Sequence, residues 1–189
     1  MKTLQIVKKT VIAIALLAAA TVQAGVKVVG VEIGASTVDQ VRKVAAAAGK
    51  VQDLGTSSFT KGVILGVDNP DLGIDGVTNV IYVFDQAGKL AAIEMTMPAS
   101  KSLQDIQKSR FDEIANMLAS KYKQTKKVRP FVGDRFARFS APDTVIELDA
   151  PHMSHDMNLR YMTPAFVQQM NNGVKAEAQE KRATEKSRL

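Results

Sequence analysis

The stretch NVIYVFDQAGKLAAIEMTM, residues 79–97, predicts a β-hairpin and decides the fold class. Two runs rich in β-branched and aromatic residues flank the four-residue turn DQAG at 85–88, which ends in glycine. In the second run Ile93, Met95 and Met97 alternate with smaller or polar residues. This period of two predicts a strand with one buried face and one face partly in water.

Upstream of the hairpin, residues 51–78 contain regularly spaced glycines and the turn cluster DNPD at 68–71, which extends the hairpin into an antiparallel meander. Before the meander, Thr37 and Gln40 form a capping box, and apolar residues then follow at helical spacing to Ala48. We expect Gly49 to end this helix in the left-handed conformation. The β-rich residues 26–34 predict a first strand.

Downstream, Ser100 or Ser102 is expected to start the longest helix, which runs to about Tyr122. Its predicted inward stripe consists of Leu103, Ile106, Phe111, Ile114, Ala115, Leu118 and Tyr122. Three strands are expected at 135–140, 144–149 and 158–162, followed by a short helix that opens at Pro164. Helices and hairpin strands in this order predict an α+β fold: an antiparallel sheet packed against two main helices, plus a C-terminal helix.

Three segments follow from this reading: a signal peptide at 1–24, a single α+β domain at 25–172, and a charged tail at 173–189 that is either helical or disordered. The first segment has a basic start, an apolar core at 11–20 and the small-residue pattern Val22-Gln23-Ala24. We expect cleavage after Ala24 and a periplasmic location. No later stretch is apolar for about 18 residues, so no transmembrane segment is expected after signal cleavage.

The charge balance argues against a nucleic-acid partner. The chain has 25 basic and 19 acidic residues, a formal charge of +6, but three of the lysines lie in the predicted signal peptide. The mature chain would therefore carry only +3, and an exported protein does not meet nucleic acid.

The residue inventory excludes much chemistry. The chain has no Cys, no Trp and two His, which rules out cysteine nucleophiles and cysteine-based metal centres. It contains no nucleophile elbow, Walker loop or dinucleotide fingerprint. We therefore expect a protein without catalysis and without a cofactor, and a hydrolase of envelope polymers remains the third choice.

Three motifs carry a family resemblance: FDEIANMLASKY at 111–122, VIEL at 145–148 and LRY at 159–161. Together they resemble a group of uncharacterised secreted bacterial α+β proteins. More loosely, the opening helix followed by hairpins is similar to the small outer-membrane-assembly lipoproteins of the SmpA/OmlA type. That family is anchored through a lipidated Cys, which this chain lacks. The resemblance implies a fold class and assigns no function.

The first candidate site is a basic segment with a single acid between its ends, Asp134. Its members are Lys121, Lys123, Lys126, Lys127, Arg129, Arg135 and Arg138. If the fold gathers these cations at a helix end and a strand start, the surface would bind an anionic partner, either an envelope protein or an anionic polymer. The competing interpretation is a solvated helix end and loop.

The alternative site is a histidine and methionine cluster that contains both histidines of the chain. Its members are Asp149, His152, Met153, His155, Asp156 and Met157. Imidazole and thioether groups together suit copper, so the alternative function is periplasmic copper handling. The competing interpretation is a polar loop between two strands, with the methionines packing against the sheet.

Overall fold

The structure is a computed structural model that describes residues 25–99 and 110–188. The expected signal peptide, and Leu103 and Ile106 of the expected long helix, lie outside the described residues. Within them the chain forms, in order, β1 (Lys27–Val28), β2 (Val31–Glu32), α1 (Val38–Ala48), β3 (Val51–Thr56), β4 (Val63–Asp68), β5 (Asn79–Phe84), β6 (Leu90–Pro98), α2 (Arg110–Ala119), β7 (Lys123–Val128), β8 (Arg135–Ala141), β9 (Thr144–Ala150), β10 (Asp156–Met162) and α3 (Pro164–Ser187).

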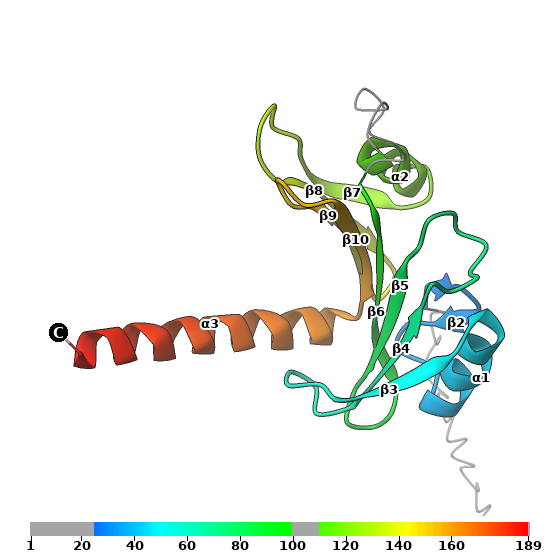
Figure 1. Ribbon diagram of the computed structural model, residues 1–189, viewed down its shortest axis with the longest axis horizontal. Coiled ribbons are helices and arrows are strands. Elements are labelled where there is room, and N and C mark those ends of the chain that lie inside the picture. Colours follow the sequence, from blue (N-terminus) through cyan, green and yellow to red (C-terminus); the bar gives the residue numbers. More distant parts are fainter. Residues whose placement is uncertain (1–24, 100–109, 189) are drawn as a thin grey trace, which may run out of the picture.

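The main sheet has eight strands in the order β3-β4-β5-β6-β10-β9-β8-β7, and each strand is antiparallel to its neighbours. The order is symmetric about the boundary between β6 and β10. On each side of that boundary, one helix is followed in the chain by four strands, α1 by β3–β6 and α2 by β7–β10. In each half the first strand lies at the edge of the sheet and the fourth at its centre. This arrangement confirms the α+β class. It also shows a helix-plus-four-strand unit repeated in the topology (Figure 1).

The core lies between the sheet and the helices α1 and α2, which cover the same side of it (Figure 1). Alternate residues of the central strands point into this core, among them Met95 and Met97 of β6 and Leu159 of β10. Both helices present their predicted apolar stripes to it: Val41 and Ala45 from α1, and Phe111, Ile114, Ala115 and Leu118 from α2. Burial of these side chains is the main term that stabilises the fold.

The third helix lies on the other side of the sheet and projects away from it (Figure 1). Thr163 caps its first turn by accepting from the Phe166 backbone N–H, and Pro164 occupies the first helical position. Only its first turns are packed: Phe166 is buried against Ala92 and Met162, with Met170 at the edge of that cluster. Gly173 lies against the ring of Phe59, and the turns after it are exposed as far as Ser187. Of the helices described, none is long and apolar enough to cross a membrane.

Three local sequence patterns predicted the structure correctly: a capping box, a hairpin turn and a helical apolar stripe. The capping box of Thr37 and Gln40 is formed, and α1 has the predicted limits. The turn of the β5–β6 hairpin closes with the Asp85 N–H donating to the Lys89 carbonyl, and Gly88 has a φ of 73°. The inward stripe expected for the long helix is confirmed for the four residues of it that lie within α2.

Four expectations about elements were wrong. Residues 26–34 form two short strands rather than one, because Val29 and Gly30 take positive φ values and reverse the chain. Gly49 has a φ of 163°, which is extended and not left-handed. The second helix ends at Ala119, before Tyr122, and β7 follows it where a helix end and loop were expected. The last helix is not short, since it continues through the charged tail.

Candidate functional site

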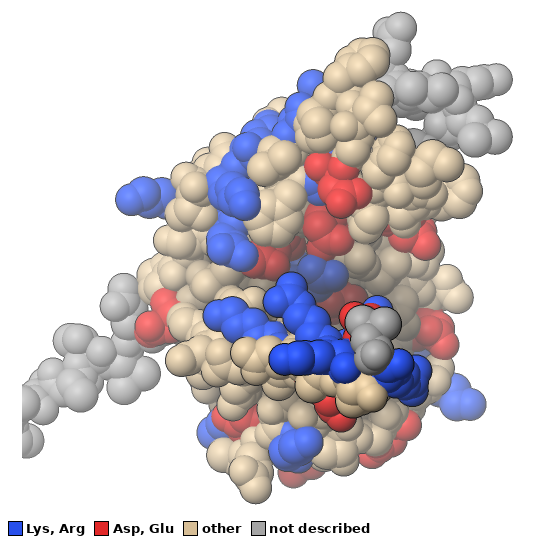
Figure 2. Space-filling model, turned by 90° about the vertical axis from the view of Figure 1, so that its left-hand side faces the viewer, with Lys and Arg blue, Asp and Glu red and all other residues tan. Residues whose placement is uncertain are grey.

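The open face of the sheet carries a row of charged side chains at its centre. Residues directly opposite one another on neighbouring strands share a face. The register aligns a charged row across five strands, namely Lys126, Arg138, Glu147, Arg160 and Glu94, and the apolar Ile81 of β5 follows it. Its members alternate with the buried residues that face α1 and α2, so the row points to the side from which α3 projects. Figure 2 looks onto this side, with α3 projecting toward the viewer, and acidic and basic side chains lie close together on the surface above it.

Two groups of ion pairs hold this row together. Arg160 donates from Nε to Glu94 Oε2 at 2.5 Å and from Nη1 to Asp149 on the neighbouring strand. Arg138 donates from Nε to Glu147 Oε1 at 2.8 Å, and the Glu147 side chain is only 6% exposed. Each arginine therefore satisfies carboxylates that the sheet partly removes from water, which is the condition under which a buried charge is tolerated.

Burial perturbs the titration of this row. Burial raises the pKa of Asp149 above its ordinary value of 3.8, and the charge of Arg160 offsets part of that increase. For Arg160, burial works to lower the pKa, but the charges of Glu94 and Asp149 outweigh it and the pKa is raised. Arg160 is thus the cation that pairs with both carboxylates, Glu94 and Asp149.

Part of the sequence-predicted basic segment lies at one border of this open face. Lys123 and Lys126 belong to β7, all six residues of which are exposed, and they pair with Ser140 and Arg138 of β8. The ring of Phe136 lies between two cations: Lys126 Nζ is 5.6 Å from its centroid and the Arg138 guanidinium carbon 5.5 Å. We call Lys123, Lys126, Phe136 and Arg138 the basic border. A band of basic side chains is visible along one border of the face in Figure 2.

The structure does not gather all seven predicted cations into one patch. Lys127 and Arg129 both reach Asp112 of α2, and Arg129 Nη2 is 2.8 Å from Asp112 Oδ2. Lys121 lines a groove beside α2, and Arg135 lies next to the loop that joins β9 to β10. The reason is the strand β7, because its side chains alternate between the two faces of the sheet instead of lying on one helix surface.

The histidine and methionine cluster is also divided. His152, Met153 and His155 lie in the exposed loop between β9 and β10, and the His152 backbone N–H donates to Asp134 Oδ1. Met157 is fully buried in the core, and Asp149 pairs with Arg160 on the open face. Asp156 is exposed at the first position of β10. In the described part of the chain, no three His, Cys, Asp or Glu side chains are placed to hold one metal ion.

Comparisons of the chain with known protein families, with curated proteins and with solved structures found no match.

Sequence reasoning missed the ion-paired row, although a partial signal was present. Glu94, Glu147 and Arg160 each occupy the wet face of a strand whose other face is apolar. Charged residues at the middle of such faces indicate a functional or an ion-paired surface. The register that brings them together joins strands distant in sequence, so it cannot be predicted from a local pattern.

Proposed function

We propose that this protein is a non-catalytic binding module that holds an extended, acidic segment of a partner protein along β7, at the basic border. The observation that carries the proposal is the coincidence of an exposed edge strand with an open cationic surface. Within the described residues β7 pairs with β8 alone, so its outer backbone groups face away from the sheet.

An edge strand binds extended peptides by main-chain hydrogen bonds, and the neighbouring side chains select the sequence. Here the neighbouring side chains are Lys123, Lys126 and Arg138, of which the two lysines form no ion pair with a described carboxylate. A partner segment with alternating acidic residues would therefore place its carboxylates against these cations. Phe136 adds an apolar surface between them.

Lysines on an edge strand have a second known effect, since they discourage pairing between copies of the same chain. That effect requires no partner, so the two interpretations differ in one observable. A binding surface captures an acidic protein in a salt-dependent way, and a protective edge captures none.

The compartment is part of the same proposal. The basic and apolar pattern of residues 1–24 supports export to the periplasm with cleavage after Ala24. We expect mass spectrometry of the protein from its producing cell to find Gly25 at the N-terminus. A chain that starts at Met1 in the cytoplasmic fraction would contradict this location.

We expect the double variant Lys123→Glu, Lys126→Glu to lose partner capture while its melting temperature stays close to that of the wild type. Exposed charges contribute little to stability, but they govern electrostatic attraction, which is screened over about 8–10 Å at physiological salt. The measurement is affinity capture from an envelope extract with the tagged chain, repeated at increasing salt. Capture by the wild type should weaken steadily with salt.

The matched control is Lys43→Glu, Lys50→Glu, which makes the same charge change at exposed positions in and just after α1, on the opposite side of the sheet. This control should capture the same protein as the wild type. Equal losses in both double variants would show that net charge matters and β7 does not. Retention of an anionic polysaccharide without any acidic protein would also contradict the proposal.

A further inference from the structure

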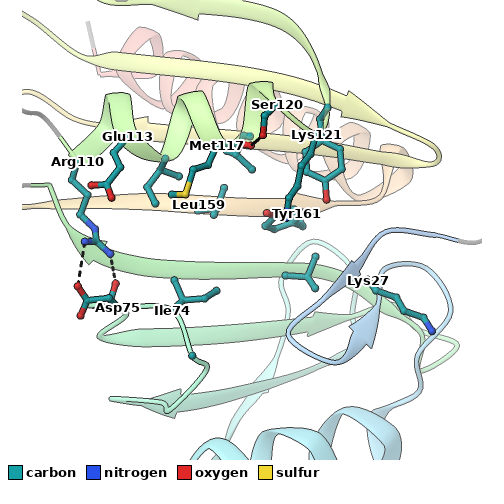
Figure 3. A pocket seen from close by; sticks show the side chains of 15 residues that line it. Lys27, Ile74, Asp75, Arg110, Glu113, Met117, Ser120, Lys121, Leu159 and Tyr161 are labelled. Carbon is teal, nitrogen blue, oxygen red and sulfur yellow. Dashed lines mark hydrogen bonds and ion pairs between the residues drawn. The ribbon is translucent and has the colours of Figure 1, made fainter.

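A groove on the helix-covered side of the sheet contains no residue of the basic border and is not used by the proposed function. It encloses about 500 Å³ between α2, β1 and the loop at 73–75 (Figure 3). Cavities that bind small molecules fall at about 300–1,000 Å³. The groove exists because α2 packs on β8 and β9 while α1 packs on β3 and β4, so neither helix covers the centre of the sheet.

The walls and floor of the groove are mainly apolar. Leu159 and Tyr161 of β10 form part of the lining together with Ile114 and Leu118 of α2, and Ile74 contributes from the facing loop. At its rim Met117 is 50% exposed, although the other large apolar side chains of the same helix are buried. An apolar chain bound here would cover Met117 and remove further apolar surface from water.

The charges of the groove are separated between its ends. At one end the buried Arg110 contacts Asp75, with Glu113 beside it (Figure 3). Toward the other end lie Lys121, just past α2, and Lys27 of β1, whose side chain extends away from the groove (Figure 3). Both are exposed, and neither forms an ion pair with a described carboxylate. At the first end two carboxylates outnumber the one guanidinium and disfavour an anion, whereas the lysine end favours one.

We propose that this groove binds an amphipathic anion, with its apolar chain along Ile74, Met117 and Leu159 and its negatively charged head group at the lysine end, on the side of Lys121. The polarity of the groove fixes the orientation of the ligand, and its apolar lining selects an acyl or alkyl chain over a polar anion. This head-and-chain chemistry is shared by free fatty acids and by lipids with a phosphate head group.

The test is calorimetric titration of the whole protein with three probes that share one chain: dodecanoate, dodecyl phosphate and dodecyltrimethylammonium, each below its micelle concentration. We expect saturable binding of at least one of the two anions, and at least tenfold weaker binding of the cation. Binding of the carboxylate alone would indicate a fatty acid, and binding of the phosphate alone would indicate a phospholipid. No saturable binding of either anion, or equal affinity for all three probes, overturns the proposal.

Variants then separate the head-group contact from the chain contact. Lys27→Glu, Lys121→Glu should weaken binding of the anion at least tenfold and should not weaken binding of the cation. Lys43→Glu, Lys50→Glu is the matched control for the charge change and should leave both affinities unaltered. Met117→Glu should weaken all three probes, whereas Met153→Glu, at a methionine that is 87% exposed in the β9–β10 loop, should have no effect.

All four variants change exposed positions, so the melting temperature can report whether each remains folded. If the control pair weakens binding as much as Lys27→Glu, Lys121→Glu, the head group does not lie at the lysine end and the proposal fails. Because Lys123 and Lys126 lie on another face, their reversal should leave probe binding unchanged. Failure of this site is thereby distinguishable from failure of the β7 surface.

Discussion

Phe139→Ala should lower the free energy of unfolding by about 3–5 kcal/mol, the largest single loss that we expect in this protein. Phe139 is fully buried on β8, on the face of the sheet that α2 covers. Truncation removes most of a large apolar side chain and leaves a cavity that the rigid sheet cannot fill by collapsing. Chemical denaturation followed by circular dichroism measures the change.

The matched control for this prediction is Phe131→Ala. Phe131 lies between β7 and β8 and is fully exposed, so the same truncation removes no buried surface. Its unfolding free energy should stay within about 0.5 kcal/mol of the wild type. Similar losses in both variants would contradict the assignment of β8 to the core.

Arg160→Met should destabilise the protein by about 2–4 kcal/mol at neutral pH, because it leaves Glu94 and Asp149 without their shared cation. These side chains are 20–35% exposed, which places the loss below that of a fully buried pair. Methionine keeps the length and the apolar stem of the arginine, so the lost interaction is mainly electrostatic.

The loss should also depend on pH, with a sign set by Asp149. Its folded pKa is raised from 3.8, so the folded state binds this proton more tightly than the unfolded chain. Its contribution to stability is therefore greatest below the unfolded pKa and falls as pH rises toward the folded pKa. The charge of Arg160 lowers the pKa of Asp149, so removing Arg160 raises that pKa further. The pH range over which protonation of Asp149 stabilises the fold then becomes wider. The deficit of Arg160→Met should thus shrink as the pH is lowered toward 4.

The exposed pair formed by Arg42 and Asp53 provides the control, since its side chains are 45% and 60% exposed and its atoms 3.8 Å apart. Arg42→Met should cost no more than about 1 kcal/mol at neutral pH. If Arg160→Met cost the same and showed no pH dependence, the row of ion pairs would have no special role in the sheet.

The elements specified by interactions between residues close in sequence were predicted, and those specified by distant residues were not. The capping box at Thr37 and the alternation in β6 are local, and both elements formed as predicted. The strand β7 carries no apolar alternation, and its conformation comes from pairing with β8, so local pattern could not reveal it. The helix expected to extend toward Tyr122 competes there with this pairing.

The candidate sites show the same division. The histidine and methionine cluster is continuous in sequence, but the alternation of β10 sends Met157 into the core while its neighbour Asp156 stays exposed. Conversely, Glu94 and Arg160 are separated by 66 residues and meet only because β6 pairs with β10. Sequence reasoning found the cations of the basic border, and only the register showed which of them share a surface.

Site-specific photo-crosslinking in the producing cell tests the central claim, that β7 holds an acidic protein segment. The photoreactive residue would replace Thr125, which is exposed in β7, or Ala47, which is exposed in α1 on the other side of the sheet. We predict a discrete adduct from position 125 that maps to an acidic segment, disappears with Lys123→Glu, Lys126→Glu, and is absent from position 47. No adduct from position 125, or one that persists in the charge-reversal variant, would contradict the account.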